Sequence, residues 1–511
     1  MGLLRGGRRE PLSRTFARHR KPPPALFLCW PVRRQSKRGG AAAAASGCAP
    51  EGADLLQARV FGEARSQRNL GWRLRHAVKG KPTCFDGKTM SQCGRGDAAA
   101  SGAMEAMRRF SLADQVIEEA APDLQDALAD AYRRKVRPLC LCKEPGPAMY
   151  IAQVGDQYVV KRMPLSGGGH DPSCLSYEPP DELSGLGVLM GSAIQVDSES
   201  GMAALKLGFS LSKVGARLAP PRGDGGSDSV AGDTKKLSLR GLLHYLWHEA
   251  ELNVWTSRWA GKRHWWNIRW HLIEAARQMT AKGGPLSDIL FVPEPFRSAD
   301  KTAIEQRRAE ALAPAVPTKS GPRKLMILVG EIKEFGVARS GHKLVVKHMP
   351  GFVFLLDDGL YRRLQNRFET EMALWGADKA SHLIAIATFG LTPAGLAVIE
   401  EMAVMVVAEN WVPYESAYEK KLLDALARVR ERSVKALRYN LPLDKPAVAA
   451  MLQIPPRPVG LYVVPPSSDH AYEETLSELI ASRPEFDSWI WRTADGEMPP
   501  LPVWQDRVPV T

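Results

Sequence analysis

The 511-residue sequence lacks a long hydrophobic run. The longest apolar stretch of interest, Leu396 to Ala408, is interrupted by Glu400 and Glu401. It is well short of the roughly 20 apolar residues that a membrane-spanning helix requires. The sequence therefore predicts no transmembrane segment and no membrane partner. Its hydrophobic fraction of 44% is available for globular cores.

Most of the chain also lacks an excess of charge. The whole sequence has 69 Lys and Arg against 56 Asp and Glu, a formal charge of +13. Residues 1–103 hold 20 of the basic and 6 of the acidic residues, which is +14 and leaves 49 against 50, or −1, for the remainder. A basic balance is a footprint of nucleic-acid binding, but here it is confined to one segment. Binding by the remainder must therefore rest on local patches.

The same first segment lacks the periodic pattern of folded chain. Ala, Arg, Gly and Pro supply 52 of residues 1–103, with no sustained period of 2 or 3.6. We expect a basic, disordered extension. We interpret it as the result of a start site placed too early, with Met104 or Met107 as the natural beginning. The alternative is a basic arm that binds polyanions.

Cysteine is scarce in the patterned part of the chain, where all three lie in one 35-residue stretch. Cys140, Cys142 and Cys174, with His170, form the pattern C-x-C-x27-H-x3-C. These are the four ligands of a tetrahedral structural zinc site, and a predicted β-hairpin over 149–163 would bring its halves together. We predict a structural zinc ion; the alternative is three buried or free thiols with a surface histidine. The lack of a disulfide pattern predicts a cytoplasmic location.

Short motifs follow one another in order along the chain. They are Cys140 to Cys142, Met149 to Ala152, Lys161 to Pro164, His170 to Cys174, Ser176 to Pro180, Glu182 to Gly187, Ala204 to Ser212, Leu239 to Trp247, Ala260 to Arg263, His382 to Phe389 and Arg438 to Leu441. Over residues 107–502 this series resembles the bacterial domain-of-unknown-function family 1173. The resemblance implies an uncharacterised bacterial protein associated with mobile or integrative genetic elements. The extension before Met104 has no counterpart in it.

The middle of the chain, over 236–310, predicts a helix-turn-helix-like region. A winged-helix variant of this fold is also compatible with the pattern. Its helices are expected at 239–252 and 263–280, with a strand at 289–292. Six tryptophans lie among cations between residues 247 and 270, a composition that suits stacking on nucleobases. The spacing of Trp266, Trp270 and Ile273 assigns that stripe to the core. Arg263, Trp265 and Arg269 are then the outward candidates for nucleic-acid contact. For His244 and His248 a solvated or capping role is preferred over metal binding.

An α/β region is expected over 324–410, and its first strand contains Glu331-Ile332-Lys333. An E-x-K strand is half of a metal-dependent nuclease signature. The missing aspartate could come from Asp288, across a proline-rich linker, with Asp357 or Asp358 as further acids. We favour a solvent-facing hairpin strand over this arrangement.

The last hundred residues predict the element order α-β-β-β-α-β. This order resembles the restriction-endonuclease-like core, whose active members carry an aspartate on the second strand and Glu-x-Lys on the third. Here the second strand begins Pro446-Ala447-Val448-Ala449 and the third reads Gly460-Leu461-Tyr462-Val463. Both catalytic positions are apolar, so the resemblance implies a degenerate nuclease fold. Lys435 and Arg438, on the first strand, are further nucleic-acid candidates.

These observations predict a multidomain α+β protein. The expected segments are an extension over 1–103, a zinc-knuckle and β-hairpin domain over 104–214, a linker over 215–235, the helical region 236–310, the α/β region 324–410 and the nuclease-like domain 411–511. The leading hypothesis is a zinc-stabilised protein that binds DNA, RNA or a protein of the same mobile element without catalysis. The alternatives are a metal-dependent nuclease using Glu331, Lys333 and nearby acids, and a protein–protein adaptor.

Overall fold

The computed structural model of the protein describes residues 108–113, 115–154, 157–163, 166–197, 200–213, 235–317, 321–454 and 457–502. The predicted extension 1–103 and nearly all of the predicted linker lie outside these residues. The described residues belong to one compact unit. Helices make up 31% and strands 29% of the described residues, so the α+β class is confirmed. No helix of the described part is both long enough and apolar enough to cross a membrane.

Residues 108–178, here called the small unit, have a core of their own. Its elements are β1 (Arg109–Leu112), β2 (Gln115–Glu118), α1 (Leu124–Arg133), β3 (Leu139–Cys140), β4 (Met149–Val154) and β5 (Gln157–Arg162). The first three strands form a sheet in the order β2-β1-β3, and β4 and β5 form the predicted hairpin. α1 turns its apolar face inward and buries Leu128 and Ala131. The core holds ten buried residues, which is small for a unit without another source of stability.

The main body, residues 179–502, is built around a β-barrel. Its strands are β14 (Met326–Val337), β15 (His342–Val346), β16 (Val353–Leu356), β17 (His382–Leu391) and β18 (Ala397–Val407). Each strand pairs with its neighbour in the order β14-β15-β16-β18-β17, and β17 pairs back with β14, which closes the ring. Only the β16–β18 pairing within this ring is parallel. α5 (Asp358–Arg367) and α6 (Glu369–Ala377) connect β16 to β17. This five-stranded Greek-key order is that of the OB-fold barrel.

Strand β14 is long because it serves two partners. Its first half pairs with β17 and its second half with β15, with a register irregularity between Ile332 and Glu334. Gly330 lies near this change of partner, where an added Cβ would come within 2.8 Å of Val346 Cγ1. The short strand β12 (Leu290–Phe291) adds to β14 in parallel. The strand expected at 289–292 is therefore an extension of the barrel sheet.

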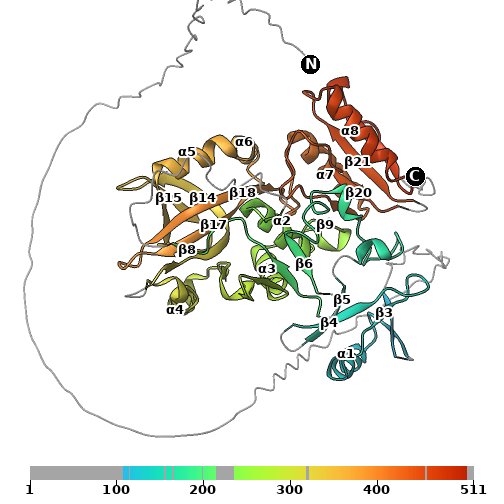
Figure 1. Cartoon of the computed structure of the whole chain (residues 1–511), viewed down its shortest axis with the longest axis horizontal. Coiled ribbons are helices and arrows are strands. Elements are labelled where there is room, and N and C mark those ends of the chain that lie inside the picture. The colour runs from blue at the N-terminus through green and yellow to red at the C-terminus, as the bar shows by residue number, and fades with distance from the viewer. Residues whose placement is uncertain are drawn as a thin grey trace, which may run out of the picture. The chain divides into compact units, whose positions relative to one another are not determined.

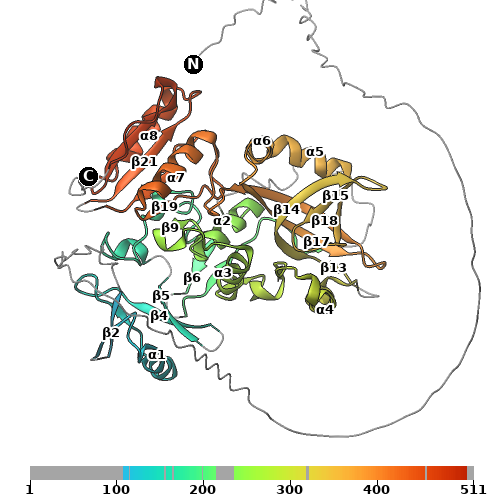
Figure 2. The same ribbon diagram turned by 180° about the vertical axis from the view of Figure 1, so that it is seen from behind.

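Helices pack around the barrel and join its core. α2 (Leu239–Glu249) and α3 (Trp265–Arg277) share one hydrophobic cluster with the barrel strands. Figures 1 and 2 show α5 and α6 on one side of the barrel and α4 (Lys301–Leu312) on the other. Every residue of α2 from Leu239 to Trp247 is buried. The region expected to form a separate helix-turn-helix domain is thus part of the main core. Between β16 and β17 the chain forms two helices, α5 and α6, that meet at Phe368.

A small sheet also links segments that the sequence placed apart. Its order is β11-β10-β7-β6, from β6 (Ile194–Val196), β7 (Ala203–Leu205), β10 (Met279–Ala281) and β11 (Gly284–Pro285). β6 and β7 form a short antiparallel hairpin. It lies in the main core together with α2, so the predicted segment 104–214 is split between the small unit and the main body. β8 (Ser212–Lys213) pairs with β13 (Arg323–Lys324).

The C-terminal region has the predicted element order. It runs α7 (Ala417–Val429), β19 (Ser433–Lys435), β20 (Ala450–Leu452), β21 (Val459–Val464), α8 (His470–Ala481) and β22 (Asp487–Arg492). The sheet order is β22-β21-β20-β19-β9, with β21 and β22 parallel. The fifth strand, β9 (Val254–Trp255), comes from between α2 and α3. One sheet therefore crosses the boundary expected between 236–310 and 411–511.

Candidate metal centre and candidate binding residues

The four predicted zinc ligands converge in the small unit. Cys140 ends β3, Cys142 follows it by two residues, His170 ends the 3-10 helix Gly167–Gly169, and Cys174 lies in the next turn. Their ligand atoms all lie within 4.8 Å of one another. This is the one group of three or more potential metal ligands among the described residues. The cluster could hold a metal ion.

Three of the six distances within the cluster match the edges of a tetrahedral site. Cys140 Sγ lies 3.7 Å from Cys174 Sγ, and His170 Nδ1 lies 3.4 Å from Cys142 Sγ and 3.8 Å from Cys174 Sγ. A tetrahedron with zinc–sulfur bonds of about 2.3 Å and a zinc–nitrogen bond of about 2.0 Å has edges of roughly 3.6–3.8 Å. These three pairs are therefore spaced as ligands around one central ion would be.

Local hydrogen bonds favour the thiolate form of Cys174, whereas the hydrogen bond with Cys174 raises the pKa of Cys140 and burial raises the pKa of Cys142. The backbone N–H of Asp171 donates to Cys142 Sγ at 3.4 Å, and that of Ser176 donates to Cys174 Sγ at 3.3 Å. The hydrogen bond from the Cys140 thiol lowers the pKa of Cys174 to about 4. Hydrogen bonds to a charged group stabilise that charge, and the thiolate is the form that ligates metals.

Buried charges join the small unit to the main body. The Arg432 guanidinium donates to the carbonyl oxygens of Leu175 and Tyr177 at 3.0 and 3.1 Å. Glu178 pairs with Arg162, and its other oxygen lies 3.4 Å from His248 Nε2. Burial opposes the charged form of both groups, but the opposite charges outweigh it. They lower the pKa of Glu178 to about 2 and raise that of His248 to about 9.

The two histidines of α2 have separate roles. His244 Nδ1 accepts the backbone N–H of Tyr439 at 2.9 Å, and burial lowers the pKa of His244 to about 3. His248 is held by Glu178 instead. Each ring has its own protein partner, and neither belongs to the Cys/His cluster. Both are buried or nearly so, which corrects the solvated role preferred from sequence.

The predicted nuclease residues do not converge. Glu331 is 3% exposed, and one of its carboxylate oxygens contacts Lys347 Nζ at 2.5 Å and His382 Nδ1 at 2.6 Å. Lys333 and Asp288 are exposed. The prediction that this strand faces solvent holds for the exposed Lys333 and is wrong for the buried Glu331. The register of β14 is irregular after Ile332, which breaks the regular alternation of its side chains between the two faces.

The further acids of the nuclease alternative have local roles as well. Asp357 caps α5 by accepting the backbone N–H of Leu360 at 2.6 Å, and Asp358 lies 3.2 Å from His342. Glu331 therefore contacts two cationic or imidazole groups where a metal site needs a second carboxylate.

The outward candidates of α3 point inward. Trp265 is 5% exposed and donates from Nε1 to the Pro293 carbonyl at 2.7 Å. Arg263 is buried and donates to the carbonyls of Leu252 and Asn410, and Arg269 is half-buried and donates to that of Val292.

The helical stripe is rotated from the prediction for a local reason. Trp266 and Trp270, assigned to the core from their spacing, are 60% and 38% exposed. The helix starts directly after His264, and the buried carbonyl of Pro293 takes the indole of Trp265. Ile268 and Leu272 continue the buried stripe that Trp265 begins.

The C-terminal candidates are also buried. Lys435 is 2% exposed and pairs with Glu419 at 3.2 Å, while Arg438 pairs with Glu415 and donates to the carbonyls of Pro442 and Lys445. Four of the five predicted nucleic-acid residues thus bond inside the protein, and the half-buried Arg269 donates its Nε–H to a backbone carbonyl. A pattern of cations shows their positions in sequence but not which of them are needed for internal pairing.

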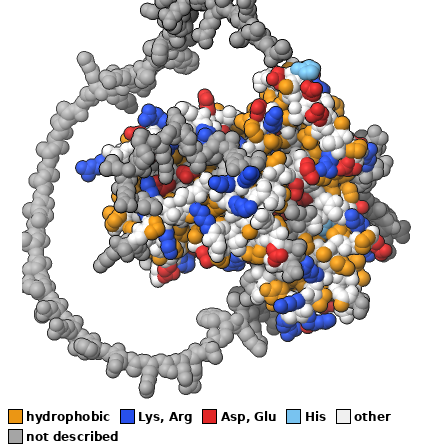
Figure 3. All heavy atoms as spheres, in the orientation of Figure 1, with side chains coloured by type: hydrophobic (Ala, Val, Ile, Leu, Met, Phe, Trp, Pro, Cys, Tyr) orange, Lys and Arg blue, Asp and Glu red, His pale blue; other side chains and the backbone are white. Residues whose placement is uncertain are grey.

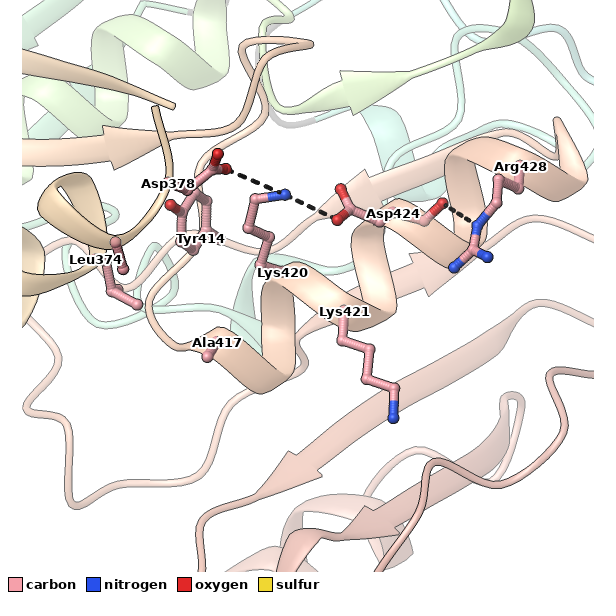
Figure 4. Close-up of a pocket in the computed structure, with 9 residues that line it drawn as sticks. Leu374, Asp378, Tyr414, Ala417, Lys420, Lys421, Asp424 and Arg428 are labelled. Atoms are coloured by element: carbon pink, nitrogen blue, oxygen red, sulfur yellow. Dashed lines mark hydrogen bonds and ion pairs between the residues drawn. The ribbon is translucent and has the colours of Figure 1, made fainter. Parts of the chain in front are cut away.

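A groove with a volume of about 330 Å³ lies between α6 and α7 (Figure 4). Lys420 reaches both Asp378 at 3.4 Å and Asp424 at 2.8 Å. Arg428 donates to the Asp424 carbonyl at 3.2 Å. Lys421 points away from these groups, and its Nζ lies 5.5 Å from the centre of the Trp491 ring. Internal pairs therefore use much of the charge in this groove.

Sequence reasoning missed one group of exposed cations. The β14–β15 hairpin carries Lys333, Arg339 and Lys343. Of these three residues, only Lys333 belongs to a predicted motif, the E-x-K strand of the nuclease alternative. The available signal was a charge imbalance, since residues 333–347 contain four Lys or Arg and one acid, Glu334.

A family model described as "Protein of unknown function (DUF1173)" matches residues 110–494. The chain belongs to this family, as the ordered motifs predicted. Neither the search of curated proteins nor that of solved structures gave a match.

Proposed function

We propose that the chain is a zinc-stabilised protein that binds nucleic acid without cleaving it. The observation that carries the proposal is the closed barrel of β14 to β18, whose strand order is that of the OB-fold. Barrels of this type bind oligonucleotides or oligosaccharides on an exposed strand face. A fold does not by itself determine a function, so the exposed cations on the barrel are the second support. A cytoplasmic location and an association with mobile genetic elements belong to the same proposal.

Zinc has a structural role in this proposal. Cys140, Cys142, His170 and Cys174 would hold it, and they leave no open position for a substrate when all four bind. The ion would link β3 to the segment that follows the β4–β5 hairpin. The protein's own contribution is the pair of backbone N–H groups of Asp171 and Ser176 that donate to the sulfur atoms. Such outer contacts orient and stabilise metal ligands.

The C-terminal sheet has a supporting part in the proposal. We regard it as a degenerate restriction-endonuclease-like core, which its element order supports. The positions expected to carry catalytic acids are in buried apolar strands, where Ala449 and Leu461 are examples. A hydrolytic magnesium ion needs oxygen ligands, which these residues do not supply.

The nuclease alternative has less support than binding alone. Glu331 lies between Lys347 and His382, an arrangement that neutralises its charge. The adaptor alternative shares the zinc centre with the leading proposal and differs in its ligand. The test must therefore distinguish a nucleic acid from a protein partner.

A combined experiment tests the proposal on the full chain. Elemental analysis should find about one zinc per chain, with a strong decrease in Cys140→Ser and no change in Ser173→Ala. Hydrogen exchange should show peptides within 108–502 that an oligonucleotide protects. Incubation of labelled DNA and RNA with magnesium or manganese should leave them intact. Cleavage that Glu331→Ala abolishes would establish the nuclease instead, and a lack of protection throughout 108–502 would remove nucleic acid as the ligand.

A further inference from the structure

Three cations on the β14–β15 hairpin lack the internal partners that other cations of the main body have. Lys333 and Arg339 are exposed and Lys343 is half-buried. Among the described residues, none of the three forms an ion pair. By contrast, Lys435 and Arg438 are paired inside the protein. A cation that the fold does not use is available to an external anion.

The hairpin holds these cations in a defined geometry. Gly336 pairs with Lys343 across the hairpin, and Lys343 pairs in turn with Leu355 of β16. An added Cβ at Gly336 would come within 2.8 Å of Lys343 Cε. The glycine therefore leaves room for the lysine stem to lie across the strand. Gly341, with φ of +74°, closes the turn after Arg339, and an added Cβ there would come within 2.4 Å of the Leu356 carbonyl.

The alternation of side chains separates the two faces of this sheet. Leu344 and Phe354 are fully buried in the barrel core. Lys343 and Leu355 are next to Leu344 and Phe354 along their strands. Because side chains alternate between the two faces of a sheet, Lys343 and Leu355 lie on the outer face, where they are half-buried. In barrels of this topology, the outer face of the second and third strands and the loop before them contact oligonucleotides. Here these are β15, β16 and the turn that carries Arg339.

Aromatic rings lie beside the same hairpin. The His342 ring stacks on Tyr361 of α5, with centroids 3.8 Å apart, and Phe335 lies 5.7 Å from Tyr361. All three rings are half-buried, so their edges reach the surface. The register pairs Phe335 with Leu344 and His342 with Leu356, so these two rings lie on the face of the sheet opposite to Lys343. Barrels of this topology that bind DNA without sequence preference hold a single strand along a cationic groove, and we therefore expect a single strand as the ligand.

A fourth cation is positioned from within. The Lys347 side chain is 43% exposed, and Glu331 holds its ammonium at 2.5 Å while also contacting His382. The backbone N–H of Lys347 donates to the Glu331 carbonyl at 2.8 Å. Glu331 is thus a positioning residue, and we do not count Lys347 among the phosphate contacts.

Figure 3 shows Lys and Arg side chains projecting at the left end of the molecule, where Figure 1 places the hairpin.

We infer that the outer face of the β14–β15 hairpin, with Lys333, Arg339 and Lys343, binds the phosphates of a single-stranded nucleic acid. This inference rests on the proposed function and adds the surface and the strand class.

The cations at the end of α1 provide a matched comparison. Arg133, Arg134 and Lys135 are equally basic and exposed. Arg133 and Arg134 both pair with Asp130, at 3.4 and 3.1 Å, and cations at a helix C-terminus also stabilise the helix dipole. These local roles account for the α1 cations without a ligand. They can be neutralised as a control that changes the net charge by the same amount.

The first test is a footprint on the unmodified full chain. Hydrogen exchange is measured with and without a 15-nucleotide thymidine oligomer, a length within the range that one such barrel covers. We expect protection of peptides from 331 to 356 and none in α1. Protection elsewhere in 108–502 would overturn the hairpin assignment and leave nucleic-acid binding intact. No protection anywhere in 108–502 would overturn the proposed function as well.

The second test compares two variants of equal charge change. Lys333→Gln/Arg339→Gln/Lys343→Gln should lower the slope of log affinity against log salt by about 2, because each contact to a single strand contributes about 0.7. At 0.1 M salt this corresponds to a loss of about a hundredfold. Arg133→Gln/Arg134→Gln/Lys135→Gln should leave the slope unchanged. The basic extension is the same in both variants, so it cancels in the comparison.

Three outcomes of these two tests would contradict the inference. An equal decrease in the α1 variant would show general attraction to a polyanion. Equal affinity for a duplex of the same length would remove the single-strand assignment. Equal protection of the hairpin by phosphatidylserine vesicles would favour a membrane surface. If the triple variant fails to fold, the single change Arg339→Gln at the exposed turn should still lower the slope by about 0.7.

Discussion

The small unit and the main body are stabilised in different ways. The small unit has ten buried core residues and four convergent metal ligands. The main body has one extensive core that unites the barrel, α2 and α3. It buries cations such as Lys435 inside ion pairs, whereas the small unit buries Arg162 against Glu178 only where it meets the main body and keeps Arg133 and Arg134 at its surface. A large core tolerates the cost of buried charge, and a small core needs a metal.

Removal of the metal should have the largest effect and should separate the two regions. Structural zinc contributes about 10–16 kcal/mol of binding free energy in small domains at neutral pH. In Cys140→Ser we expect rapid hydrogen exchange over 108–178, with the main body still protected. Residues 108–178 contain no tryptophan, so near-ultraviolet signals from tryptophan should largely persist.

A control for this comparison is Ser173→Ala, which changes an exposed residue of the same loop. It should keep both the metal and the protection. Simultaneous unfolding of both regions in Cys140→Ser would mean that the small unit is not a separate source of stability.

Breaking a buried ion pair should destabilise the main body by the next largest amount. Lys435→Met leaves Glu419 buried without its cation, which costs about 3–5 kcal/mol. Burial already raises the pKa of Glu419, so the acid should take up a proton in this variant. Lys435→Met/Glu419→Leu should recover much of the loss. Urea unfolding measures both, and a single variant as stable as the parent would contradict the burial of this pair.

The contact between the two regions should depend on pH. Burial opposes the charged form of His248, but Glu178 outweighs it and raises the pKa to about 9, above the unfolded value of about 6.5. The resulting stability is fully present below about pH 6.5 and is lost as the pH rises through about 9. We expect a decrease on the order of 2 kcal/mol, absent in His248→Gln. A parent chain whose unfolding free energy is constant from pH 6.5 to 9.5 would argue against the pair.

The end of α1 offers the smallest and most local test. Lys135 has φ of +57°, and the N–H groups of Lys135 and Val136 donate to the carbonyls of Tyr132 and Ala131. This helix ending usually has glycine at that position. Lys135→Gly should stabilise the small unit by about 0.5–1 kcal/mol. Arg134→Gly, at φ of −80°, should destabilise it by a similar amount, as thermal unfolding can measure. Equal effects of the two changes would contradict the left-handed conformation.

The sequence predicted the local elements and the convergence of the Cys/His cluster. C-x-C and H-x3-C hold their residues close together along the chain, and a hairpin of regular alternation joins the two pairs. The C-terminal order α-β-β-β-α-β was predictable for the same reason, because period and turn residues are local signals.

Long-range pairing could not be predicted in the same way. The barrel closes through β14 and β17, and the C-terminal sheet gains β9 from nearly 180 residues earlier. No periodic pattern of apolar residues in the sequence indicates either strand pairing. The predicted outward orientation of Trp265 was wrong for a related reason, because the partner of its indole N–H is the carbonyl of Pro293. A helical stripe one residue out of phase reverses which tryptophans face the core.

If Cys140, Cys142, His170 and Cys174 hold one zinc ion, X-ray absorption at the zinc edge of the purified chain should reveal its ligands. We expect three sulfur atoms at about 2.3 Å and one nitrogen at about 2.0 Å. Cys140→Ser should lose the metal or replace one sulfur by a lighter atom. A chain without zinc after mild purification, or a shell of oxygen and nitrogen only, would show that these four residues do not form a zinc site.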